Sequence, residues 1–94
     1  MNLIIKVKET KGYCPVFREN DSYMLEDGYK LKSDIPLCMH ALSSVIPFYN
    51  ALRVSGPEEF GIAGKEDSSA GFVQCPDVCS YTDGGTVIFK ITRE

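Results

Sequence analysis

No stretch of the 94-residue sequence approaches the roughly 20 consecutive apolar residues that a membrane-spanning helix needs. The ten lysine and arginine residues form no block of like charge, and a net charge of −3 provides no basic field to attract nucleic acid. The apolar segment Leu3–Ile5 is too short for the core of a secretory signal, and lysines follow it at once. We therefore predict a soluble, cytoplasmic protein that binds neither membranes nor nucleic acid.

The sequence also lacks the common catalytic patterns. It has one histidine, His40, and we find no catalytic triad or dyad and no phosphate-binding glycine loop. Its four cysteines form no Cys-x-x-Cys motif, whereas a zinc ribbon needs two such pairs. The sequence therefore leaves open whether the protein is an enzyme.

The apolar content is sufficient for one folded domain. Hydrophobic residues make up 44% of the chain and charged residues 24%, as in ordinary soluble domains. A chain of this length can form a single core without cross-links. We predict one domain over residues 1–94, of the α+β class. It would have a small, mostly antiparallel sheet of four or five strands and one main helix packed on one face.

Strands are predicted from alternation and from turn residues. Apolar and polar residues alternate over 2–9 and again over 86–92, so we expect these two strands to be central in the sheet, where they could be adjacent. The pair Asp27-Gly28 lies between two β-prone runs, which predicts a hairpin over 21–32. A further strand is predicted over 71–75, where Pro76 would end it.

One helix is predicted, over residues 36–52. Pro36 suits its first turn, and Ser33 or Asp34 can cap it. Pro47 lacks a backbone donor and should kink the helix or end its regular part. The expected apolar face comprises Cys38, Leu42, Val45, Tyr49 and Leu52.

The segment 53–71 shows no periodic pattern and is rich in glycine, proline and charged residues. We predict a long, mobile connection, least ordered over 57–70. If it borders the cysteines, it would be the natural lid over a ligand.

The most specific feature is the placement of the cysteines. Cys14 and Cys75 each precede a proline in a predicted loop, and Cys38 lies in the first helical turn. We expect these three to lie near one end of the helix, with Cys79 apart. Thiols stay reduced in the cytoplasm, so we do not expect a disulfide framework.

Three roles for these cysteines remain open from the residues. Cys14, Cys38 and Cys75 could bind zinc or iron; His40 could not join them, because it would lie about 200° around the helix from Cys38. Alternatively, the helix dipole could favour a reactive Cys38 thiolate, with Asp77 as a proton carrier or as a cap for its turn. In the third interpretation the cysteines are small buried hydrophobes.

Two further features bear on ligands and partners. Arg53 follows the predicted helix. Its positive charge could interact favourably with the C-terminal end of the helix dipole, or it could form an anion clamp beside Ser55-Gly56. Ile4 and Ile88 lie on the otherwise polar faces of their strands, which suggests a second buried surface and a homo-oligomer.

Four motifs resemble those of a family of small uncharacterised prokaryotic proteins. They are Gly12-Tyr13-Cys14-Pro15, Leu37-Cys38, Pro47 followed by Leu52-Arg53, and Cys75-Pro76-Asp77. The chain departs from the family after Pro15: of the family's Gly-His-Lys-like run and following Gly-Asp, only Asp21 is matched. Cys79 corresponds to no family position. The resemblance implies a similar fold and the set of three cysteines, and it implies no activity.

These observations predict a binding module. Its ligand would be a metal or a thiol-reactive molecule, held by Cys14, Cys38 and Cys75 together with Asp77 and Arg53. The alternative is an oligomeric structural or interaction protein in which the cysteines are only core residues.

Overall fold

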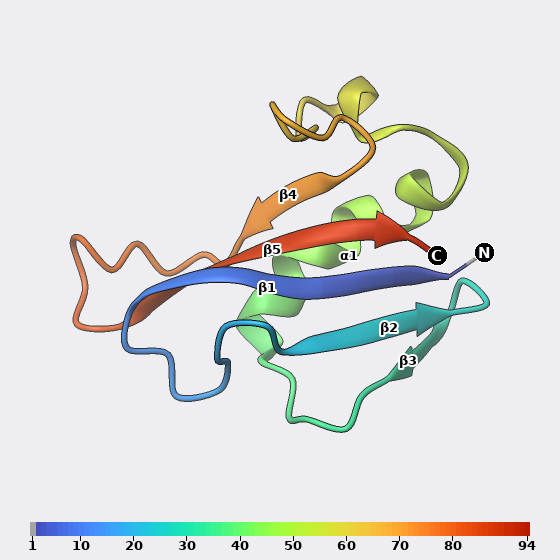
Figure 1. The fold of residues 1–94 in the computed structure, drawn as a ribbon. Helices are drawn as coiled ribbons and strands as arrows, with labels where there is room; N and C mark the ends of the chain where they lie inside the picture. The colour runs from blue at the N-terminus through green and yellow to red at the C-terminus, as the bar shows by residue number, and fades with distance from the viewer. Residues whose placement is uncertain (1) are drawn as a thin grey trace.

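A computed structural model describes residues 2–94 as a single antiparallel sheet with one long helix against one of its faces (Figure 1). The strands are β1 (Leu3–Gly12), β2 (Ser22–Glu26), β3 (Lys30–Lys32), β4 (Gly71–Gln74) and β5 (Gly85–Arg93). The helix is α1 (Met39–Val54), and a short 3-10 helix, η1 (Pro57–Phe60), follows it. The predicted α+β class is confirmed.

The five strands are ordered β3-β2-β1-β5-β4, so the two strands with the strongest alternation are central and adjacent. Ile5 lies opposite Ile91 and Val7 opposite Phe89, which places all four side chains on the face that α1 covers. A bulge between Val7 and Glu9 shifts the register toward the end of β1.

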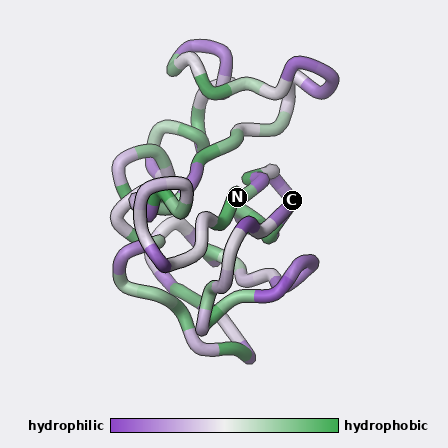
Figure 2. The backbone as a smooth tube through the Cα atoms, turned by 90° about the vertical axis from the view of Figure 1, so that its left-hand side faces the viewer, coloured by the Kyte–Doolittle hydropathy of each residue, from purple (hydrophilic) through white to green (hydrophobic). Residues whose placement is uncertain are grey.

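The core lies between this sheet face and α1. Its most deeply buried strand residues, each no more than 2% exposed, are Leu3, Ile5, Val7, Val87, Phe89 and Ile91. The helix contributes Ala41, Val45 and Leu52. Phe17, from the loop after β1, packs edge-on against Phe89 with ring centroids 5.3 Å apart. Hydrophilic stretches lie mainly in the projecting loops (Figure 2).

The helix begins and ends later than the predicted range 36–52: its N-cap is Cys38, and it runs over Met39–Val54. Pro36 stays outside the helix, and the hydroxyl of Ser33 bonds the backbone of Ile35 instead of capping α1. Pro47 is exposed and lies within the helix, which continues to Val54. Its regular part therefore does not end there. Within residues 2–94, no helix has the length and apolar character needed to cross a membrane.

The connection between α1 and β4 contains more structure than its composition predicts. After η1, Ala63 forms a bridge with Gly71. The Gly64 amide donates to the Ala70 carbonyl at 2.9 Å, and the Phe72 amide donates to the Ile62 carbonyl at 2.8 Å. These bonds fold the segment back along β4, and the mobility expected of it stays a prediction.

Candidate functional site

A cavity of about 550 Å³ lies where the loop after β1, the start of α1 and the loop between β4 and β5 meet. Cys14, Cys38 and Cys75 all line it, and Cys79 does not. We call it the cysteine cavity. None of the residues 57–70 lines it, so the connection before β4 is not placed to act as its lid.

Cys75 is the most buried of the three, at 6% exposure. Its sulfur accepts a hydrogen bond from the Val87 amide at 3.2 Å, and its thiol donates to the Gly85 carbonyl at 3.6 Å. The end of β4 is thereby tied to the start of β5. Because both hydrogen-bonding capacities of this thiol are used, Cys75 has a structural role.

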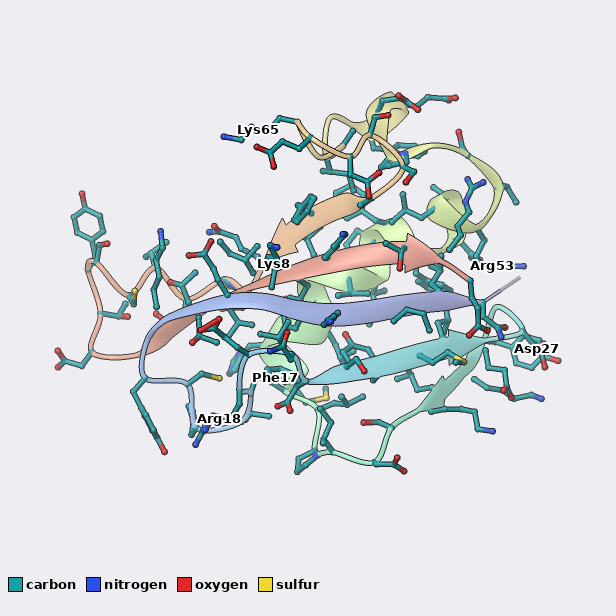
Figure 3. The ribbon with its side chains drawn as sticks, in the orientation of Figure 1. Lys8, Phe17, Arg18, Asp27, Arg53 and Lys65 are labelled. Carbon is teal, nitrogen blue, oxygen red and sulfur yellow. The ribbon has the colours of Figure 1, made fainter. Side chains whose placement is uncertain are left out.

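Cys14 is half-buried in a turn that it helps to hold. Its sulfur accepts a hydrogen bond from the Phe17 amide at 3.3 Å. The guanidinium of Arg18 donates to the Cys14 carbonyl at 2.7 Å and lies 5.6 Å from the centre of the Tyr13 ring. Figure 3 shows Arg18 at the outer side of this loop. The turn therefore presents Cys14 to the cavity on a braced backbone.

Cys38 is half-buried at the N-terminal end of α1. Its backbone is extended and its carbonyl accepts the first helical bond, from the Leu42 amide at 3.0 Å, but its side chain does not cap the helix. Since Cys38 precedes the helix, the angular argument that separated it from His40 was wrong. His40 lines the same cavity and is exposed.

The described residues around the cavity show no group of metal ligands. Across residues 2–94, no three histidine, cysteine, aspartate or glutamate side chains are grouped so as to hold a metal ion. The predicted zinc or iron site at Cys14, Cys38 and Cys75 therefore has no support. The two hydrogen bonds of the Cys75 thiol help to explain this, because a thiolate ligand would have to give up its bond to the Gly85 carbonyl.

Asp77 also lines the cavity, and its hydrogen bonds brace the loop between β4 and β5. The Thr82 hydroxyl donates to the Asp77 carboxylate, and the Thr86 hydroxyl donates to the Asp77 carbonyl at 2.6 Å. Of the two roles predicted for Asp77, this arrangement favours the cap of a turn over the proton carrier.

The two loops that bound the cavity meet at Gly85. A Cβ atom on Gly85 would lie 2.5 Å from the carbonyl carbon of Tyr13 and 2.6 Å from the amide nitrogen of Cys14. Only a residue without a side chain allows β5 to begin so close to the loop that carries Cys14.

Arg53 lies at the other end of α1 and does not line the cysteine cavity. Figure 3 shows it near the hairpin turn that contains Asp27. Its guanidinium donates to the Asn50 side chain at 2.6 Å and covers Gly28, where a Cβ atom would lie 2.5 Å from Cζ. Arg53 is therefore not placed to share a ligand with the cysteines.

Two features of these regions have no signal in the sequence. The helix C-terminus is bound by Arg93, whose guanidinium donates to the carbonyls of Leu52, at 2.7 Å, and Ser55. The apolar wall of the cysteine cavity comes from all three segments, and its members are Pro15, Val16, Phe17, Ala41, Pro76, Val78 and Val87. Only the folded topology brings these wall residues together.

Comparison with known proteins gave no match to a family model, to a curated protein or to a solved structure. The predicted resemblance to a family of small prokaryotic proteins therefore stays a prediction.

Proposed function

We propose that this protein binds a small, mainly apolar, thiol-reactive molecule in the cysteine cavity. The observation that carries the proposal is that Cys14 and Cys38 line one cavity of about 550 Å³, whose apolar walls come from three separate segments. Small-molecule sites commonly enclose about 300–1,000 Å³ and combine apolar walls with a few polar groups.

Cys38 is the thiol best placed to contact such a ligand. Cys75 uses its thiol in the sheet, and Cys14 uses its sulfur in its own turn, whereas the Cys38 side chain caps no backbone group. A ligand with an activated carbon–carbon double bond suits this thiol. Addition would break the S–H bond and the π bond of the double bond, form one C–S bond and one C–H bond to the neighbouring carbon, and require no oxidant.

The experiment compares the rates at which N-phenylmaleimide modifies each cysteine, followed by peptide mass mapping. If the cavity binds the reagent before it reacts, the rate at Cys38 will saturate as the reagent concentration rises, and the rate at Cys79 will rise linearly. Val78→Lys, in the cavity wall, should abolish the saturation, whereas Val54→Lys, at an exposed site outside the cavity, should preserve it. A linear rate at Cys38 would overturn the proposal.

A second candidate function is that of an oligomeric interaction protein. The sheet face opposite α1 has no helix over it (Figure 1), and Ile4 and Met24 lie half-buried on it, opposite one another. Ile88 is less available, because it lines a cleft with residues 63–67 of the preceding connection. Light scattering tests this candidate: a dimer that Ile4→Lys converts to a monomer supports it, and a wild-type monomer excludes it.

A further inference from the structure

A second apolar cavity of about 160 Å³ lies between α1 and the β2–β3 hairpin and shares no residue with the cysteine cavity. We call it the hairpin cleft. Every residue that lines it is aliphatic or aromatic. Three large side chains at its rim are unusually exposed: Tyr29 at 77%, Leu31 at 51% and Ile46 at 57%. Contiguous exposed apolar side chains of this kind mark sites that another molecule covers.

The cleft also contains a polar atom without a partner. Tyr23 lines the cleft and is 5% exposed, and its hydroxyl is buried with no hydrogen-bond partner in the part of the chain that the structure describes. Burial raises the pKa of Tyr23 to about 12, so the hydroxyl is a donor at neutral pH. Buried hydroxyls are normally hydrogen-bonded, so this one leaves an unsatisfied donor in a residue of the cleft wall.

Beside the cleft, the sheet ends in a free edge. Among the strands of residues 2–94, β3 is the outermost and pairs only with β2, so the backbone groups along its other side are available to a further strand. Leu31 lies opposite Leu25, on the same sheet face as the cleft, whereas Lys30 and Lys32 lie on the opposite face. Both lysine side chains are more than half exposed, although both approach Glu26 and the Lys30 amino group also donates to the Asp27 carboxylate at 3.1 Å.

This register determines which strand fits. A residue opposite Leu31 on an added strand would direct its side chain to the hairpin cleft, and its two neighbours would lie beside Lys30 and Lys32. The complementary pattern is therefore acidic–apolar–acidic. A second copy of β3 does not fit, because antiparallel pairing would place the lysines of both copies on one face.

We propose that the β3 edge and the hairpin cleft bind an extended segment of another protein with an acidic–apolar–acidic sequence. The segment adds a strand to the sheet through backbone hydrogen bonds, its apolar side chain occupies the cleft, and its acidic side chains pair with Lys30 and Lys32. The proposal is independent of the ligand of the cysteine cavity.

The test uses a capped seven-residue peptide with Glu-Tyr-Glu at its centre, and a control peptide with Lys-Tyr-Lys in its place. Titration followed by amide chemical shifts should show saturable changes in β3 and at Ile46 for the acidic peptide only. Ile46→Asp should weaken binding at least tenfold. Val54→Asp, an exposed site on the same helix outside the cleft, should leave it unchanged.

Charge reversal provides a second check. Lys32→Glu should weaken binding of the acidic peptide and strengthen binding of the basic one. Loss of folding could not produce this opposite pair of changes. If neither peptide binds the wild-type protein, or if both bind equally, the proposal is overturned, and the edge lysines serve only to prevent strand association. Self-association through β3, detected by light scattering and abolished by Ile46→Asp, would also overturn it.

Discussion

Cys75 combines deep burial with a sulfur that accepts a hydrogen bond from the Val87 amide. Cys75→Ala removes that acceptor and leaves a small cavity, so we expect the free energy of unfolding to fall by about 1–3 kcal/mol. Urea denaturation measures the change. Cys79→Ala, at a half-buried cysteine outside the cavity, is the matched control. An equal loss in both variants would show that the bonds of the Cys75 sulfur contribute nothing specific.

A pH-dependent effect is expected from Tyr23. Burial raises the pKa of its hydroxyl from the ordinary value of 10.0 to about 12 in the folded chain. The folded state therefore keeps this proton where the unfolded state loses it. The resulting contribution to stability is complete below pH 10 and is lost as the pH rises toward 12.

Tyr23→Phe should remove that part of the pH dependence, which urea unfolding at about pH 8 and about pH 11 would detect. It also deletes an unpartnered buried hydroxyl, so at the lower pH we expect no loss of stability, or a gain of up to about 1 kcal/mol. A substantial loss at the lower pH would show that the hydroxyl has a partner, such as an ordered water.

At the scale of elements, β1 and β5 place two like charges side by side. Lys6 lies directly opposite Lys90, whose amino group is also 3.9 Å from Asp67. Like charges in directly opposed positions destabilise a sheet. Lys6→Glu should therefore raise the free energy of unfolding by about 0.2–1 kcal/mol, with a smaller gain at high salt. Lys11→Glu, on the same strand but opposite Thr86, is the comparison, and an equal gain there would indicate a general effect of net charge.

The elements that the sequence predicts well are those with a local physical signal. Alternation identifies β1 and β5, and the turn at Asp27-Gly28 has the positive φ angles, 56° and 87°, that an Asp-Gly hairpin requires. The helix begins later than predicted, because the Ser33 hydroxyl bonds the backbone of Ile35 instead of capping the helix, and composition does not show this difference. The connection before β4 is folded by backbone hydrogen bonds, which leave no periodic pattern of apolar residues in the sequence.

The candidate sites follow the same division. The positions of the cysteines at element ends are visible in the sequence, but the bonds of Cys75 to β5 depend on strand order. The hairpin cleft has no sequence motif, because its lining comes from three strands and a helix, with Tyr29 from the hairpin turn.

At the scale of the whole molecule, Gly85 joins the cysteine cavity to the core. An added methyl group would meet the backbone of Tyr13 and Cys14 at 2.5–2.6 Å, so either the loop or β5 must shift. We expect Gly85→Ala to lower the free energy of unfolding by about 1–3 kcal/mol and to raise the maleimide reactivity of Cys14. Thermal unfolding and mass mapping measure the two effects. Unchanged stability would show that the loop moves freely.

The pairing of β1 with β5 also bears on the synthesis of the chain. Leu3 lies opposite Arg93, so the centre of the sheet is formed by residues from nearly opposite ends of the described chain. Before β5 has emerged from the ribosome, β4 has no strand to pair with, and β1 can pair with β2 alone. Folding must then wait for the long-range closure, which is slow compared with local contacts. Until then the apolar faces of β1 and α1 are uncovered. A chaperone that binds exposed apolar segments would therefore bind this chain before β5 pairs with β1.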